Sequence, residues 1–133
     1  MWKPRIASSL VGDDLKNIHL LGSKCESCKR EYFPARKNCP HCLREDTLES
    51  IQLSDYGKLH SYVICQVAPP GYDIPHTQGY IDLDNDGPRI FAILIEYGDA
   101  GNLYVGRKME LKIVPYNKNE TEENILEYRF RPV

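Results

Sequence analysis

The chain has 133 residues, a net charge of −2 at pH 7 and a sequence pI near 6.1. This length lies in the usual single-domain range, and the slightly acidic balance argues against a nucleic-acid-binding surface, which normally raises the pI well above neutral. Met1 is followed by Trp2-Lys3-Pro4-Arg5 and by no long apolar run, so we expect neither a signal peptide nor a membrane span. An odd number of cysteines beside a metal-binding motif predicts a cytoplasmic protein.

Residues 1–20 are expected to form an N-terminal extension. Residues 1–9 are polar, and we expect them to be irregular or to lie on a partner. Gly12-Asp13-Asp14 is suited to cap a short helical turn through Leu15 and Ile18.

The sharpest signal is a pair of Cys-x-x-Cys motifs, Cys25/Cys28 and Cys39/Cys42, with ten residues between them. Cysteines at this spacing can turn both sulfurs toward one ion, and two such knuckles complete a closed tetrahedron with no position left for substrate. Zinc is the default ion for four thiolates, although iron uses the same ligand set. We therefore predict a rubredoxin-like zinc ribbon over residues 21–48, with one structural zinc ion per chain.

Cations are dense around the cysteines. Four thiolates and a zinc ion carry a net charge of −2, which nearby cations and backbone N–H groups would stabilise. The alternative is a contact with a phosphate group, since arginine and lysine also bind nucleotide-like ligands. These cations are Lys24, Lys29, Arg30, Arg36, Lys37 and Arg44.

From residue 49 to residue 133 we predict a mainly β, five-stranded OB-fold barrel. Gly57 marks a bulge or bend in the long first strand, and Cys65 at its end is expected in the core. The third strand is the most continuously apolar, so we expect it to be the most buried. A hairpin turn is predicted at Asn85-Asp86-Gly87, and a short helix within 97–106. The five strands are expected at about 51–67, 79–84, 88–96, 107–115 and 125–131.

The loop at 68–79 holds three prolines and two glycines, and loops of this length tend to be functional. Two other patterns are weak. The spacing of Asp82, Asp84 and Asp86 matches half of a calcium loop, but the twelfth position is Ile93 instead of glutamate. A Cys–His nucleophile pair at Cys65 is disfavoured because no motif supports an oxyanion hole.

Motifs in a characteristic order run along nearly the whole chain from about residue 20. They are Leu-Gly-x-x-Cys-x-x-Cys at 21–28, Tyr32-Phe33-Pro34-x-Arg36, Cys39-Pro40-His41-Cys42, Gly57-x-Leu59-x-Ser61-Tyr62, Pro70-Gly71-Tyr72, Gly87-Pro88-Arg89, Val105-Gly106-x-x-Met109 and Phe130-Arg131-Pro132. Together they resemble the acyl-CoA-associated zinc-ribbon/OB-fold family, once known only as a domain of unknown function. One departure is Lys29, which stands where the family often carries glycine, and another is the polar stretch 73–79.

The resemblance implies a non-catalytic accessory subunit that clasps the catalytic subunit of a thiolase and helps to bind the CoA ester of a 3-oxoacyl substrate. On this basis Tyr32, Phe33 and Arg36 would face the ligand or the partner, and Gly71 and Tyr72 would line the path of the acyl-pantetheine arm. The first third of the chain also resembles the small subunit of benzoylsuccinyl-CoA thiolase from anaerobic toluene breakdown, which implies an aromatic acyl group.

Two alternatives stay open. The same subunit could serve an acyl-CoA hydratase, which the motifs do not separate from a thiolase. A nucleic-acid-binding module of OB-fold and zinc-ribbon type is also conceivable, because nine tyrosines offer rings on which bases stack.

Overall fold

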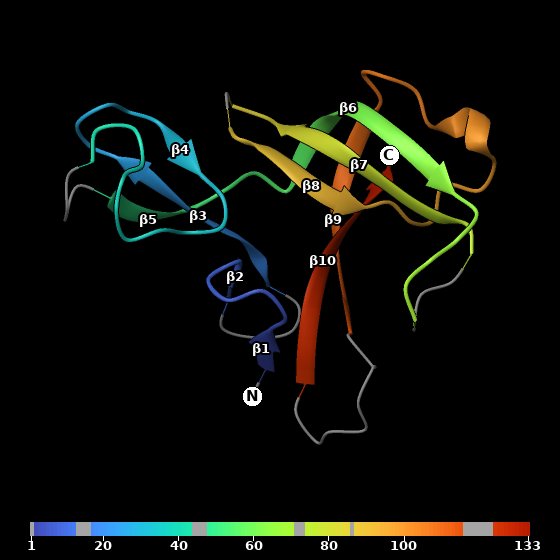
Figure 1. Cartoon of the computed structure of the whole chain (residues 1–133), viewed down its shortest axis with the longest axis horizontal. Coiled ribbons are helices and arrows are strands. Elements are labelled where there is room, and N and C mark those ends of the chain that lie inside the picture. Colours follow the sequence, from blue (N-terminus) through green and yellow to red (C-terminus); the bar gives the residue numbers. More distant parts are fainter. Residues whose placement is uncertain (1, 13–16, 44–47, 71–73, 86, 116–123) are drawn as a thin grey trace.

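A computed structural model of the chain describes residues 2–12, 17–43, 48–70, 74–85, 87–115 and 124–133. The predicted helical turn that Gly12 would cap therefore lies largely outside the described residues. Within them, the chain forms ten strands and one short 3-10 helix (Figure 1). The elements are β1 (Trp2–Pro4), β2 (Leu10–Val11), β3 (His19–Cys25), β4 (Glu31–Tyr32), β5 (Leu48–Gln52), β6 (Tyr56–Cys65), β7 (His76–Leu83), β8 (Arg89–Ile93), η1 (Ala100–Asn102), β9 (Lys108–Pro115) and β10 (Asn124–Pro132).

The zinc-ribbon part is built around β3. This strand pairs in antiparallel fashion with β2, β4 and β5. The β3–β5 pairing runs from Leu21 opposite Gln52 to Cys25 opposite Leu48. The first cysteine knuckle therefore begins at the last paired residue of β3. In Figure 1 this unit stands apart from the barrel strands, at the left of the view.

The second part is an OB-fold barrel. Its strands follow the order β1-β10-β9-β6-β7-β8. A parallel bridge from Leu94 to Phe130, next to a hydrogen bond from the Ile95 N–H to the Phe130 carbonyl oxygen (3.0 Å), joins the chain after β8 to β10. The predicted fold class is confirmed: β6, β7, β8, β9 and β10 are the five barrel strands, and η1 is the short helix expected within 97–106. The domain boundaries at residues 20 and 48 stay predictions.

The predicted first barrel strand, 51–67, is wrong as one element. It is divided into β5, which belongs to the ribbon sheet, and β6, which belongs to the barrel. Between them the Leu53 N–H donates to the Leu20 carbonyl oxygen in the ribbon (2.9 Å), while the Asp55 carbonyl oxygen accepts from Leu111 in the barrel (2.7 Å). The strand breaks because its backbone changes partners here.

The irregularity predicted at Gly57 lies further along β6, between Leu59 and Ser61. Gly57 instead permits a close approach of β7: a Cβ atom there would lie 2.6 Å from the Asp82 carbonyl oxygen. The shift in register ends the simple alternation of faces, so Val63 is exposed. For the same reason Cys65 is half-buried instead of lying in the core.

The prediction that the third barrel strand is the most buried is also wrong. Along β8 buried and exposed residues alternate: Ile90 and Ala92 are buried, while Arg89 and Phe91 are exposed. The strand lies at the end of the sheet order, and its outer face is uncovered in spite of its apolar sequence.

The N-terminal segment is not irregular, as was expected, but adds a strand to the barrel. β1 pairs in parallel with the start of β10. Glu127 is only 5% exposed, because Arg5 covers it with an ion pair of 3.1 Å. Arg129 donates a second hydrogen bond to the same carboxylate (3.0 Å).

One hydrophobic cluster runs through both parts. It includes Leu10, Ile18 and Leu20 from the ribbon side and, deepest in the barrel, Met109 and Phe130. The described part of the chain contains no helix of the length and apolar character that crossing a lipid bilayer requires.

Candidate metal centre and apolar face

Both cysteine knuckles have the same backbone construction. The Lys29 N–H donates to the Cys25 carbonyl oxygen (2.8 Å), and the Leu43 N–H donates to the Cys39 carbonyl oxygen (2.9 Å). Each knuckle is closed by a residue in the left-handed region, with φ of 62° at Lys29 and 56° at Leu43. Glycine adopts this region most easily, which explains why a glycine at position 29 would suit the turn.

The four predicted ligands converge. The Sγ atoms of Cys25, Cys28, Cys39 and Cys42 all lie within 4.8 Å of one another. Cys25 and Cys42 face each other at 3.6 Å, as do Cys28 and Cys39. Sulfurs placed tetrahedrally about 2.3 Å from a zinc ion are about 3.8 Å apart. The four cysteines are therefore positioned to bind a single ion, and their assignment as metal ligands stays a prediction.

Polar groups around Cys39 favour its thiolate form. Burial raises the pKa of Cys39, but hydrogen bonds from the backbone N–H of Cys42 and from the Tyr32 hydroxyl outweigh it and lower the pKa to about 5. The Tyr32 hydroxyl lies 3.4 Å from the Cys39 sulfur. This hydrogen bond in turn raises the pKa of Tyr32 to about 12, so the phenol keeps its proton and acts as the donor.

The loop between the knuckles carries Tyr32, Phe33 and Arg36. The Phe33 ring packs edge-on against Tyr128 of β10, with centroids 5.2 Å apart. Arg36 is exposed and lies over the Tyr32 ring, 5.5 Å from its centroid. Its backbone N–H is held by the Ser23 hydroxyl (2.6 Å). Tyr32 and Phe33 thus contact other parts of the protein, whereas Arg36 faces the solvent.

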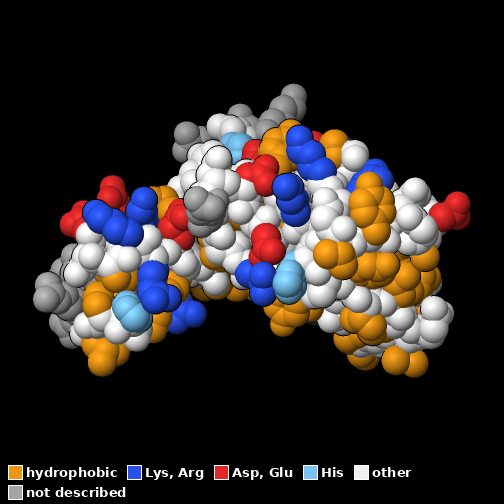
Figure 2. All heavy atoms as spheres, turned by 90° about the horizontal axis from the view of Figure 1, so that it is seen from above, with side chains coloured by type: hydrophobic (Ala, Val, Ile, Leu, Met, Phe, Trp, Pro, Cys, Tyr) orange, Lys and Arg blue, Asp and Glu red, His pale blue; other side chains and the backbone are white. Residues whose placement is uncertain are grey.

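The other two predicted ligand contacts, Gly71 and Tyr72, lie outside the described residues. The cations of the ribbon do not form a purely basic surface. Lys24 and Lys29 line a shallow hollow together with Glu26 and Glu49, so positive and negative groups share it. Figure 2 shows this mixture of charged side chains over the ribbon at the left of the view.

The described residues of the calcium-loop pattern do not form a metal site. Asp82 is engaged by Arg89 through hydrogen bonds of 2.6 and 3.3 Å, which hold the pKa of that carboxyl below its usual range. Asp86 lies outside the described residues. Among the side chains that the structure describes, the four cysteines are the only group of three or more that could share a metal ion.

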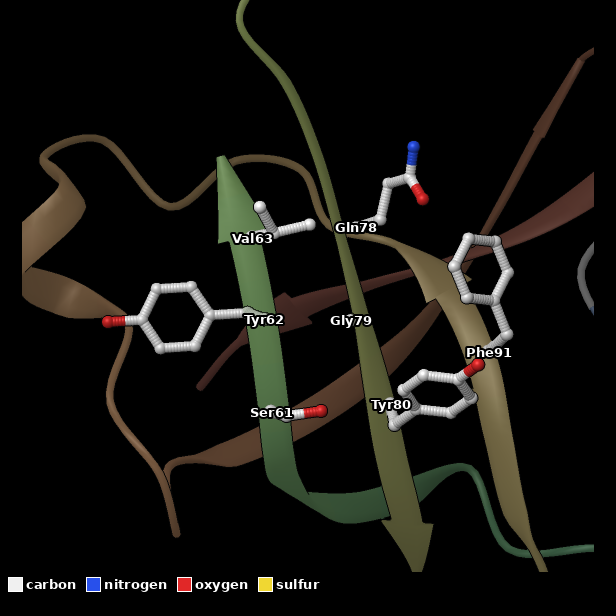
Figure 3. Close-up of a pocket in the computed structure, with 7 residues that line it drawn as sticks. All are labelled: Ser61, Tyr62, Val63, Gln78, Gly79, Tyr80 and Phe91. Atoms are coloured by element: carbon white, nitrogen blue, oxygen red, sulfur yellow. The ribbon is translucent and has the colours of Figure 1, made fainter. Parts of the chain in front are cut away.

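A second feature was not anticipated: an apolar face on the outside of the barrel. We use this name for Val63, Tyr80 and Phe91, which are 54%, 47% and 45% exposed. They line a hollow of about 280 Å³ on β6, β7 and β8, whose other lining residues are Ser61, Tyr62, Gln78 and Gly79 (Figure 3). The Tyr62 ring points away from the apolar face, because Tyr62 shares a row of the sheet with Gly79 and the buried Ala92. Figure 2 shows hydrophobic side chains gathering over the barrel end of the molecule.

The two rings of the apolar face contact each other. Tyr80 and Phe91 meet edge to face with centroids 5.7 Å apart, and Figure 3 shows these two rings side by side on neighbouring strands. On the opposite side of β6, the Tyr62 hydroxyl donates to the Leu103 carbonyl oxygen (2.9 Å). The sequence signal for this face was the continuously apolar strand around Phe91, which was interpreted as burial.

Comparisons with known proteins agree with this architecture. The model of the rubredoxin-like zinc ribbon domain of ChsH2 matches residues 13–49. A DUF35 domain-containing scaffold protein from Methanocaldococcus jannaschii is 30% identical over 118 residues, which cover 86% of this chain and 82% of that protein. The benzoylsuccinyl-CoA thiolase subunit BbsA from Thauera aromatica is 32% identical over 115 residues, or 86% of this chain and 77% of that subunit.

A solved structure has the same fold. It is an Ltp2-ChsH2(DUF35) aldolase, with a TM-score of 0.67 and 23% identity over 86% of this chain and 84% of that one. The alignment covers most of both chains, so the likeness applies to the ribbon and the barrel together.

Proposed function

Since the chain belongs to the DUF35 family of scaffold proteins, we propose that it is a non-catalytic accessory subunit of a thiolase-type acyltransferase. It binds the catalytic subunit and helps to position the acyl-CoA substrate, and the carbon–carbon bond chemistry belongs to the partner. The observation that carries this proposal is the similarity to a thiolase subunit over 86% of the chain.

The metal has a structural part in this proposal. Four cysteine ligands fill a tetrahedral shell, so the ion offers no position to a substrate. We assign it as zinc because the four sulfurs fit that ion and because the matching family model is a zinc ribbon. When bound, the ion supplies the cross-link that holds the two knuckles together.

The partner binds to the apolar face in this proposal. Half-exposed aromatic rings around a hollow are what protein interfaces enrich, and the catalytic subunit is the occupant that the thiolase relative indicates. The side chains at the hollow are uncharged, so burying them against a partner leaves no unpaired charge. Tyr80 and Phe91 form its centre.

The acyl-CoA ester lies near the loop between the knuckles. Of the three predicted ligand residues on this loop, Arg36 is exposed, and its guanidinium group matches a CoA phosphate. Tyr32 and Phe33 are half-buried and support the loop. Gly71 and Tyr72 remain the proposed contacts along the acyl-pantetheine arm, and an aromatic acyl group remains the proposed substrate class.

Co-expression tests the proposal. The full chain is produced together with a candidate thiolase-type catalytic chain from the same genome. We expect a hetero-oligomer on size-exclusion chromatography whose thiolase activity neither chain shows alone. Phe91→Glu should abolish the complex. Tyr56→Glu is the matched control, because Tyr56 is 39% exposed but lies outside the hollow. Full activity of the large chain without this protein would contradict the proposal, and a hydratase as the co-purifying chain would favour that alternative.

A further inference from the structure

A continuous set of contacts leads from the metal site to the apolar face. It begins at the Cys39 sulfur, 3.4 Å from the Tyr32 hydroxyl. The next residue, Phe33, packs edge-on against Tyr128, with an interplanar angle of 85°. The Tyr128 hydroxyl then donates to the carbonyl oxygen of Phe91 (3.0 Å), whose side chain belongs to the apolar face.

Tyr32 is held in position for its contact with the sulfur. It lies on β4 opposite Ser23 of β3, and Arg36 lies over its ring. Hydrogen bonds to metal-bound ligands orient them and adjust how strongly they bind the ion. The Tyr32 hydroxyl therefore acts on the metal through Cys39 without being a ligand itself.

Phe33 connects the ribbon to the barrel. It is half-buried and packs against the hydrophobic cluster that contains the barrel core. Because Phe33 follows Tyr32 directly, a change in the position of Tyr32 moves Phe33 as well. The edge-to-face contact with Tyr128 passes that movement to β10.

Tyr128 of β10 connects this strand to β8. β8 is the last strand in the sheet order, and the backbone there meets β10 at the Leu94–Phe130 bridge. The hydrogen bond from Tyr128 to Phe91 fixes β8 at a second point. The placement of Phe91 thus depends on where Tyr128 lies.

We propose that Tyr32 and Phe33 are positioning residues that couple the metal centre to the apolar face of the barrel. Tyr32 stabilises the metal-bound Cys39 thiolate, and Phe33 transmits the state of the ribbon through Tyr128 to β8. Loss of the metal, or oxidation of its thiols to disulfides by an added oxidant, loosens the strand that carries Phe91. This coupling lies within one chain and does not depend on the identity of a partner.

The first test measures zinc release from the full, zinc-loaded chain to a chromophoric chelator. Tyr32→Phe removes the hydroxyl but keeps the ring beneath Arg36, and we expect release to become about tenfold faster. Tyr104→Phe is the matched control, because Arg107 lies over Tyr104 at the same 5.5 Å but at the barrel. Equal release rates for Tyr32→Phe and the unaltered chain would overturn the role of Tyr32.

The second test measures amide hydrogen exchange in β8 with and without zinc. In the unaltered chain, removing zinc should speed exchange at β8 roughly threefold to tenfold, the effect of losing one hydrogen bond, while β9 stays unchanged. In Phe33→Leu and in Tyr128→Phe, exchange at β8 should already be fast with zinc bound and should change little on its removal. The coupling would be overturned if the exchange rate at β8 were the same with and without zinc, or if removing zinc raised the rates in β8 and β9 equally.

Discussion

The ribbon and the barrel differ in what fills their interiors. Between residues 21 and 43 the buried side chains are Ser23, Cys25 and Cys39, none of them a large apolar group. The barrel instead encloses Phe130 and Met109, both fully buried. A segment with so small a core needs a cross-link, and a metal ion supplies one. The ribbon thus depends on four cysteine sulfur atoms, whereas the barrel depends on a hydrophobic core of many side chains.

The largest expected effect comes from removing one of the four cysteine sulfurs. Cys39→Ser takes away a buried ligand, and structural zinc sites contribute about 10 kcal/mol or more to folding. We expect zinc content by atomic emission to fall from one ion per chain to almost none, and amide protection in β3–β5 to be lost while β9 stays protected. Cys65→Ser, which leaves the four ligands intact, should keep the metal. If the amides of β3–β5 stayed protected in Cys39→Ser, the ribbon would not depend on the metal more than the barrel does.

The second effect is on the barrel alone. Phe130→Ala opens a cavity at a fully buried position and should lower the free energy of unfolding by about 3–5 kcal/mol, measured by urea denaturation. Zinc content should stay at one ion per chain, because no ligand is touched. Phe91→Ala, at a half-exposed position, should cost less than about 1 kcal/mol. Loss of zinc from Phe130→Ala would show that the ribbon relies on the barrel core.

The third effect concerns the N-terminal strand. Glu127 is buried and bonded to Arg5 and Arg129, so Glu127→Gln weakens the tie between β1 and β10. We expect a loss of about 1–2 kcal/mol in urea denaturation, since hydrogen bonds to charged groups are stronger than neutral ones. Glu110→Gln is the control: its carboxylate is more exposed and pairs with Arg131, and the loss should be under about 1 kcal/mol. Equal losses would mean that burial of Glu127 adds nothing.

The same contrast explains what the sequence could predict. The four cysteines come together as the sequence predicts. Both knuckles are local, and two intervening residues suffice to turn a pair of sulfurs inward. Strands with a regular alternation, such as the one containing Met109, were also found. The break between β5 and β6 was missed because it depends on two distant partners, Leu20 and Leu111.

Exposure of apolar residues was the harder problem. The segment around Phe91 was predicted to be buried because its residues are apolar, but hydrophobicity alone does not say whether another layer covers the strand. The position of β1 against β10 is likewise set by a pairing between the two ends of the chain. Of the predicted ligand contacts, Arg36 remains accessible at the surface, whereas Tyr32 and Phe33 are engaged by Cys39 and Tyr128.

The smallest expected effect on stability comes from a surface ion pair, which belongs neither to the metal site nor to the hydrophobic core. The pKa of Asp82 is lowered because Arg89 donates hydrogen bonds to it. Its folded pKa thus lies below the unfolded value of about 3.9, so the stabilisation is present above that pH and is lost as pH falls through the folded pKa. Both side chains are about half exposed, which limits the contribution to less than about 1 kcal/mol.

Acid also releases a thiolate-bound metal, so the measurement must compare variants at each pH. Asp82→Asn should be less stable than the unaltered chain at pH 7, and this difference should be smaller at pH 2 than at pH 7. Asp99→Asn, at an exposed carboxylate beside η1, should show no difference at either pH. If the Asp82→Asn difference persisted undiminished in acid, the pair with Arg89 would not be its cause. The pH dependence of stability would then come from the metal ligands, and so from the ribbon instead of the barrel surface.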